Sequence, residues 1–138
     1  MMKISKLLCK SFALLSLLLI ACSNTDDIQQ KVTEIDASQL KVRDPFIFYD
    51  ADTDYYYLHV NGTLKVKSYK SKDLLTWQEN GYSFLPSAGF WGKEDFWAPD
   101  FYKYEDKYYL FITLSAPGVK RGTSVLVSDR VTGTFQPL

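Results

Sequence analysis

Two aspartates stand beside prolines at the entrances of apolar, aromatic stretches of this chain. Asp44 directly precedes Pro45, and Asp100 directly follows Pro99. Proline fixes its own φ and restricts the residue before it, so we expect both carboxylates to be held on stiff backbone at the mouth of a strand. A pair of carboxyl groups that flank a sugar can hydrolyse a glycosidic bond. The pattern therefore predicts that Asp44 and Asp100 face one another across a sugar site.

The sequence around these aspartates is typical of β-structure. It is 46% hydrophobic and 16% aromatic, and aromatic and β-branched residues favour strands. Turn-forming residues occupy Asp50–Asp54, the Asn61-Gly62 pair is a strong hairpin signal, and glycine and proline indicate a loop over residues 79–93. We expect strands over residues 46–49, 55–60 and 64–69, from Trp77 onward, and over residues 99–104, 108–113 and 124–128.

The predicted strands form an internal repeat. Pro45 and Pro99 are 54 positions apart, and Tyr57 and Tyr109 are 52 positions apart. Four strands per repeat at a spacing of about 50 residues is the signature of propeller blades. The sequence therefore predicts an all-β propeller of which about the first two blades lie in this chain. Because propellers usually have four to eight blades, we expect the chain to be the front part of a longer protein.

The first 21 residues have the pattern of a processing signal. Three lysines precede an apolar run from Phe12 to Ala21, which is short for a membrane span of about 20 residues. Leu19–Cys22 resembles the lipobox of bacterial lipoproteins. We therefore expect a signal peptide over residues 1–21, lipidation of Cys22, a flexible tether over residues 22–40 and a folded domain over residues 41–138. This predicts a lipid anchor in a bacterial cell envelope; a plain secretory signal with an incidental cysteine is the alternative.

Charge and cysteine content restrict the classes of partner. Removal of residues 1–21 would leave 13 Lys and Arg against 16 Asp and Glu, a net charge of −3. No basic stripe is present, so a nucleic-acid partner is not expected. Cys22 would be the only cysteine of the mature chain, so neither a disulfide framework nor a cysteine-based metal site is predicted. The expected partners are a membrane, through Cys22, and an oligo- or polysaccharide.

Several short motifs follow one another in a fixed order. They are Arg43-Asp44-Pro45, Tyr56-Tyr57-Leu58, Ser71–Trp77, Trp97–Asp100, Tyr108–Phe111, and Ser128-Asp129 with Gly133-Thr134-Phe135. In this order and spacing, from about Val42 to Leu138, the chain resembles glycoside hydrolase family 43. The resemblance implies a five-bladed β-propeller. It also implies an inverting enzyme that acts mostly on α-L-arabinofuranosides or β-xylosides of plant cell-wall polysaccharides.

The resemblance also implies roles for the two aspartates. Asp44 takes the position of the general base, and Asp100 that of the carboxylate which raises the pKa of the general acid and helps to orient it. The general acid of the family is a Glu of the third blade, which we expect to lie beyond Leu138, so this chain alone is expected to be inactive. No cofactor is implied. Some relatives hold a structural Ca²⁺ in the propeller channel, but no ligand set for one is visible in this sequence.

Each candidate residue also has a structural interpretation. Asp44 could simply cap a turn. Trp97 and Phe46 are candidates for binding substrate, but Trp97 could instead pack between blades and Phe46 could belong to the core. His59 is expected to be a core or interface residue. For the whole protein, the alternatives are a non-catalytic propeller lipoprotein that binds glycan, or a different propeller hydrolase or a glycoside phosphorylase.

Overall fold

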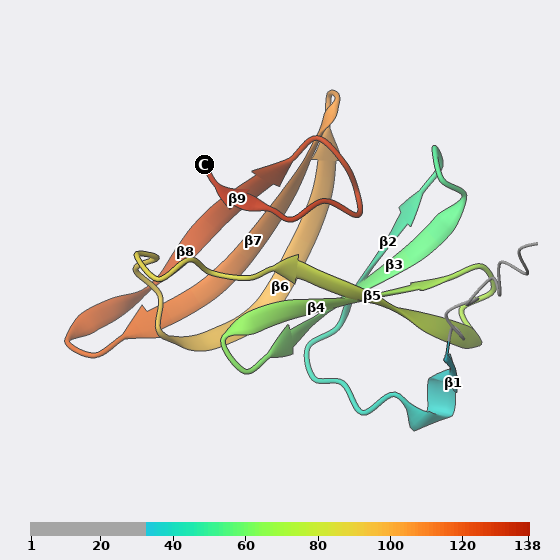
Figure 1. Cartoon of the computed structure of the whole chain (residues 1–138), viewed down its shortest axis with the longest axis horizontal. Coiled ribbons are helices and arrows are strands. Elements are labelled where there is room, and N and C mark those ends of the chain that lie inside the picture. The colour runs from blue at the N-terminus through green and yellow to red at the C-terminus, as the bar shows by residue number, and fades with distance from the viewer. Residues whose placement is uncertain (1–32) are drawn as a thin grey trace, which may run out of the picture. The chain divides into compact units, whose positions relative to one another are not determined.

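The computed structural model describes residues 33–138, which form two antiparallel β-sheets (Figure 1). The first sheet has the strand order β1-β5-β4-β3-β2, and the second has the order β6-β7-β8-β9. Apart from the 3₁₀ helix η1 (Ala37–Gln39), the regular structure of the described residues is all strand. The strands are β1 Glu34–Asp36, β2 Phe46–Asp50, β3 Tyr55–Gly62, β4 Lys65–Ser71, β5 Thr76–Phe84, β6 Glu94–Tyr104, β7 Lys107–Ala116, β8 Val119–Ser128 and β9 Gln136–Pro137.

The predicted repeat is present as two meanders of sequential strands. In the first sheet, β2 to β5 pair one after another, and in the second, β6 to β9 do the same. β2 and β6 are the first strands of the two meanders. Aromatic side chains of these two strands pack together, with the ring centroids of Phe48 and Phe101 5.0 Å apart. The fold prediction of all-β, blade-like repeats is confirmed.

One predicted hairpin turn lies two residues further along the chain. Asn61 and Gly62 belong to β3, with Gly62 opposite Lys65, and the turn consists of Thr63 and Leu64. Leu64 has a left-handed φ of 55°. This is the conformation that the prediction had assigned to the Asn-Gly pair. A Cβ atom at Gly62 would approach the Lys65 Cγ atom to 3.1 Å, so glycine fits this position through close packing.

The predicted loop over residues 79–93 is shorter than expected. β5 continues to Phe84 through irregular pairing with β4, and Gly81 with φ 75° lies in this irregular part. Phe84 is 2% exposed and packs edge-on against Phe90, with ring centroids 5.0 Å apart. Burial of Phe84 therefore favours continuation of β5, although the local composition is typical of a turn.

The described end of the predicted tether is structured. Glu34–Asp36 form the edge strand β1 and pair with β5, with Ile35 opposite Trp77, and the Ala37 N–H donates to the Leu75 carbonyl at 2.8 Å. Ile35 and Ala37 also pack on a cluster that includes the buried Trp77. The prediction of a flexible tether thus fails for residues 34–39, while the signal peptide and Cys22 lie outside the described residues.

The main hydrophobic core contains residues from both sheets. Tyr57, Val66 and Phe84 of the first sheet share one buried cluster with residues of the second sheet, among them Phe101 and Leu110. A second, smaller cluster around Trp77 includes Ile35 of β1. The core thus holds β2 and β6, and the residues at their N-terminal ends, in fixed positions relative to each other.

Candidate active site

Asp44 lies two residues before β2 in an unusual backbone conformation. Its φ is 49°, whereas the following proline was expected to favour extended backbone. Aspartate is among the few non-glycine residues that visit the left-handed region readily. Its side chain is 48% exposed, and its Oδ2 lies 3.4 Å from Nε of the exposed Arg43. The carboxylate is therefore open to solvent with one cation beside it.

Asp100 lies within β6, opposite Phe111 of β7. The next residue, Phe101, is buried in the core, so strand alternation places Asp100 on the other face of the second sheet. Asp100 is exposed there and lines a cavity of about 360 Å³ together with Tyr102, Phe111 and Thr113. This carboxylate is also accessible to a ligand.

The two aspartates do not occupy equivalent places in the repeat. The residue before proline is Asp44 in the first sheet and Ala98 in the second, and Ala98 has the same left-handed conformation, with φ 47°. Asp100 comes two residues after Ala98. The left-handed residue before proline is thus repeated in both sheets, but the carboxylate is two positions further along in the second. The two carboxylates therefore occupy different positions along their strands.

Trp97 is half-buried, and the guanidinium groups of two arginines lie over its ring. The Cζ atom of Arg121 is 4.1 Å from the ring centroid, and the Cζ atom of Arg43 is 5.7 Å from it. Trp97 thus lies close to Arg43, the neighbour of Asp44, although it comes from the other sheet. It lines a cavity with Arg43, and Arg121 reduces the ring surface that a sugar could use.

Asp95 and Arg121 form a polar contact that the sequence analysis did not predict. Arg121 Nη2 is 2.6 Å from Asp95 Oδ2, and the Ser115 hydroxyl donates to the same oxygen at 2.6 Å. Asp95 also has a left-handed φ of 55°. Asp95 and Arg121 are 26 positions apart, so no local pattern in the sequence indicates that they form a pair. The pair, with Ser115, fixes the start of β6 against β7 and β8.

Phe46, the other candidate for substrate binding, is partly buried at the start of β2. It pairs with His59 across the strands, and its ring centroid is 5.8 Å from that of Tyr102 on β6. It also packs against the main core. Phe46 therefore joins β2 to β6 on the same side as Tyr102, two residues from Asp100.

Asp50 connects the two sheets, although the sequence suggested only a turn residue. It is 1% exposed, its Oδ2 accepts from the Thr53 N–H at 3.0 Å and hydroxyl at 2.8 Å, and its Oδ1 accepts from the Tyr108 hydroxyl at 2.8 Å. Burial, followed by this bond to Asp50, raises the pKa of Tyr108 above its usual value. Lys103, whose pKa is raised mainly by its bond to Asp52, lies over the Tyr108 ring.

His59 is fully buried between the sheets. Its ring stacks on Phe101 with centroids 4.1 Å apart and an angle of 9°, and Nδ1 is 2.8 Å from the Ser83 hydroxyl. Nε2 has no hydrogen-bond partner among the described residues. Burial alone lowers the pKa of His59 to about 3. His59 is therefore a neutral core residue, in agreement with the sequence interpretation.

Within residues 33–138, no three His, Cys, Asp or Glu side chains are grouped closely enough to hold a metal ion. The same part of the chain contains no helix long and apolar enough to cross a membrane. The lipidation predicted at Cys22 falls outside the described residues.

Comparison with known proteins identifies the repeat. Residues 37–138 match the family model of the glycosyl hydrolases family 43. A solved structure described as an endo-arabinase from Bacteroides thetaiotaomicron VPI-5482 is 60% identical, with a TM-score of 0.73 over 75% of this chain and 37% of that structure's chain. No curated protein gives a significant match.

Two more distant structures support the fold alone. A thermostable family-43 glycoside hydrolase is 24% identical, with a TM-score of 0.64 over 70% of this chain and 32% of its own. A family-43 endo-arabinanase from Bacillus licheniformis is 21% identical, with a TM-score of 0.55 over 70% of this chain and 36% of its own. The chain thus spans about a third of the length of the structures it resembles.

Proposed function

Because the chain belongs to glycoside hydrolase family 43, we propose that it supplies Asp44 and Asp100 to a site that hydrolyses O-glycosidic bonds of plant-type polysaccharides. The observation that carries this proposal is the 60% identity to a structure described as an endo-arabinase. It favours α-L-arabinofuranosidic linkages, such as those of arabinan, over β-xylosidic linkages as the bonds that are cut.

In the proposed inverting mechanism, Asp44 is the general base. Its carboxylate is half-exposed, so a water molecule can reach it and lose a proton to it as the water attacks the anomeric carbon. Inversion needs the base and the acid about 6.5–9.5 Å apart, so that this water fits between them.

Asp100 is proposed to act on the general acid and not on the water. A second carboxylate near the acid disfavours loss of its proton, which raises the pKa of the acid. The acid itself is not assigned to any of the described residues. Replacing Asp100 with Asn should therefore lower the pKa of the acid and move the alkaline limb of the pH–rate profile to lower pH.

The test is hydrolysis of linear arabinan and xylan by the longest protein that the reading frame encodes. Asp44→Asn keeps the shape and tolerates the left-handed backbone, and it should lower the rate about 10²–10⁴-fold. Asp106→Asn, in the exposed turn between β6 and β7, is the matched control and should leave the rate unchanged. Proton NMR of the first sugar released should show the inverted anomer.

Two results would contradict this function. One is full activity of Asp44→Asn, which would remove the proposed base. The other is saturable binding of arabinan with no cleavage, which would instead identify a glycan-binding propeller.

We also propose that Cys22 carries the lipid that holds the protein to a bacterial envelope membrane. Support comes from the sequence alone: a basic start, a short apolar run and Leu19–Cys22. Metabolic labelling with a fatty acid should mark the protein, and Cys22→Ser should abolish the label and release the protein from membranes. Equal labelling of the Cys22→Ser variant would refute the anchor.

A further inference from the structure

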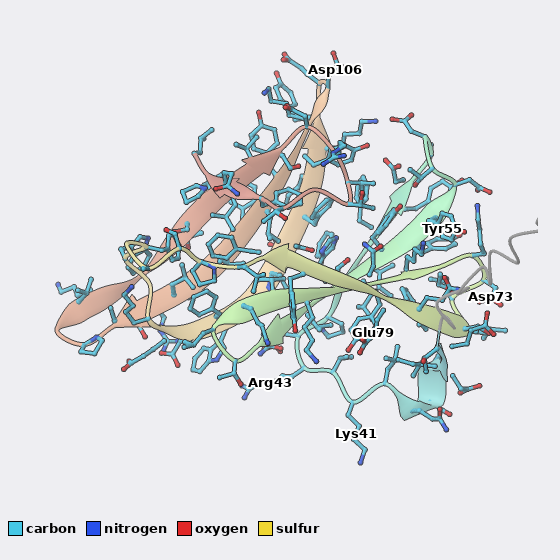
Figure 2. The ribbon with its side chains drawn as sticks, in the orientation of Figure 1. Lys41, Arg43, Tyr55, Asp73, Glu79 and Asp106 are labelled. Carbon is cyan, nitrogen blue, oxygen red and sulfur yellow. The ribbon has the colours of Figure 1, made fainter. Side chains whose placement is uncertain are left out.

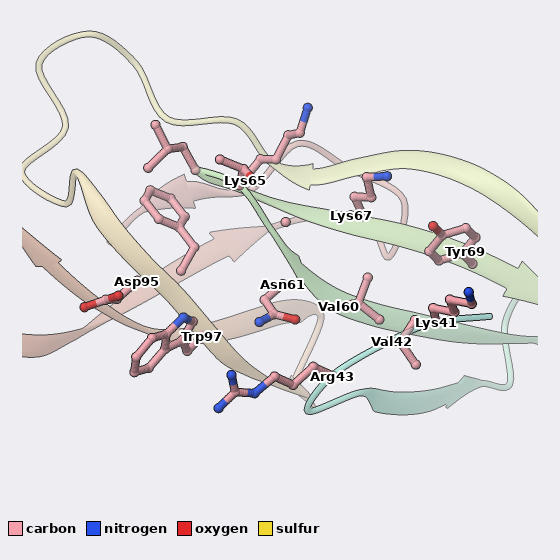
Figure 3. A pocket seen from close by; sticks show the side chains of 14 residues that line it. Lys41, Val42, Arg43, Val60, Asn61, Lys65, Lys67, Tyr69, Asp95 and Trp97 are labelled. Carbon is pink, nitrogen blue, oxygen red and sulfur yellow. The ribbon is translucent and has the colours of Figure 1, made fainter.

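A cavity of about 890 Å³ lies where the segment before β2, the β3–β4 hairpin and the start of β6 meet (Figure 3). This volume is in the upper part of the range typical of small-molecule sites. Asn61 and Thr63 contribute uncharged polar groups to its lining. Four cationic side chains also line it: Lys41, Arg43, Lys65 and Lys67.

The cavity has little negative charge to balance these cations. Asp95 is the carboxylate among its lining residues, and it is already bound by Arg121 Nη2 and the Ser115 hydroxyl, each at 2.6 Å. The positive charge of the Arg121 guanidinium already offsets the negative charge of Asp95. The lining therefore carries an excess of positive charge.

Three of the four cations, Lys41, Lys65 and Lys67, have no carboxylate partner within residues 33–138. Lys65 Nζ donates to the Tyr82 hydroxyl at 3.2 Å, and Arg43 contacts Asp44. Lys41 and Lys67 form no ion pair in this part of the chain. Lys65 and Lys67 are two residues apart on β4 and so lie on the same face of the sheet.

The cavity adjoins the proposed active site. Arg43 lines the cavity and is the direct neighbour of Asp44, and in Figure 3 its guanidinium extends toward Trp97. A glycan bound near Asp44 could therefore extend into the cavity. Hydroxyl groups of its sugars would find hydrogen-bond partners in Asn61 and Thr63.

We infer that this cavity is a subsite for acidic sugar units, in which the carboxylates of a uronate-bearing glycan pair with Lys41 and Lys67. The inference rests on the proposed function, since that function supplies a glycan beside Asp44. It goes further by assigning a charge to part of the substrate. Hydrolysis of a neutral arabinan would require only the region around the two aspartates.

The test compares three oligosaccharides by calorimetry with the full chain: an α-1,4-linked pentauronate, its methyl ester and a neutral α-1,5-arabinopentaose. The methyl ester keeps the sugar and removes the charge. The pentauronate should bind at least tenfold more tightly than its ester. Its affinity should fall as salt is added, because salt screens the charges.

Variants locate the binding. Lys41→Gln and Lys67→Gln should each weaken pentauronate binding about tenfold, since each removes one charge-assisted contact. Lys107→Gln is the control, because Lys107 lies at the start of β7 and pairs with Asp129. The Trp97 indole N–H resonance should shift on binding and the Trp91 resonance should not.

Equal affinity for the pentauronate and its ester would overturn the inference, as would unchanged pentauronate binding by Lys41→Gln and Lys67→Gln. Equal binding of free acetate on a molar basis would reduce the cavity to a simple anion site and also overturn it. Neutral arabinan hydrolysis is measured separately. An enzyme that cleaves arabinan but does not distinguish the ester from the acid keeps the proposed function and loses only this subsite.

Discussion

Acidification should destabilise this fold through a single side chain, His59. It is the one histidine of the chain, and burial lowers its pKa to about 3 in the folded state, against about 6.5 when unfolded. Below pH 6.5 the unfolded chain takes up a proton that the folded chain refuses. The free energy of unfolding is therefore lost as the pH falls from about 6.5 toward 3.

The magnitude follows from the two pKa values. Between pH 7.5 and pH 5, the loss should be about 2 kcal/mol. The figure is the same for any folded pKa below about 4, because at pH 5 only the unfolded state is then protonated. The residues around the ring, Phe46, Ser68, Ser83 and Phe101, carry no charge that could hold an imidazolium.

The three carboxylates whose pKa is lowered contribute little in this pH window. Bonds to Ser38, Lys72 and the turn after Asp73 lower the pKa of Asp36, Asp54 and Asp73 respectively. Groups with a lowered pKa lose their stabilising effect only as the pH falls through and below their ordinary value of 3.8. In the range from pH 7.5 to 5, these three carboxylates therefore do not mask the effect of His59.

The assay is urea unfolding, followed by tryptophan fluorescence, at several pH values between 7.5 and 5. His59→Asn is the control, because its amide can replace Nδ1 as the partner of Ser83 and does not titrate. The variant is expected to be less stable at every pH but to lose almost nothing on acidification. If the variant and the natural chain lose equal free energy, or if the natural chain loses none, the explanation from burial is wrong.

Four further substitutions test which contacts stabilise the fold. Asp50→Ala should lower the free energy of unfolding by about 2–4 kcal/mol, because it leaves the buried Tyr108 hydroxyl without its acceptor. Tyr108→Phe should lower it less, by about 1 kcal/mol. Equal losses for the two variants in urea unfolding would contradict this explanation. Ala98→Gly should raise the free energy of unfolding by about 0.5–1 kcal/mol by relieving the left-handed conformation; a lower value would show that Ala98 is not strained. Asp73→Ala should lower the melting temperature at pH 7, and this difference should shrink below pH 3.8, where the carboxylate of the unfolded chain is protonated.

The sequence predicted those features of the fold that depend on residues close together in the chain, namely turns and strands. Asp73 bonds its own turn, accepting from the Leu75 and Thr76 N–H groups at 2.9 and 2.8 Å, which is a contact between near neighbours in the sequence. The repeat of aromatic strands and turns also appears as expected, because alternation and turn residues act over a few positions. Figure 2 shows Asp73 and Asp106 at turns between strands.

Contacts between the sheets could not be predicted in this way. Asp50 and Tyr108 are 58 positions apart, and nothing around Asp50 distinguishes a buried acceptor from the exposed aspartates that follow it. The contact of Arg121 with Trp97 likewise depends on the pairing of β6 with β7 and β7 with β8. The first contact depends on how the two sheets pack, and the second depends on strand order within one sheet, so neither is visible in the local sequence.

The backbone before the two prolines connects the fold to the candidate site. Asp44 and Ala98 both have φ near 50°, although proline disfavours compact conformations in the residue before it. For Asp44 the cost is small, since aspartate tolerates this region, but Ala98 has no side chain that could compensate. A strained conformation persists only where the surrounding structure determines it, and such residues cluster at functional sites. Here it lies beside Trp97, two residues from Asp100, so we expect the geometry at the start of β6 to place these two side chains.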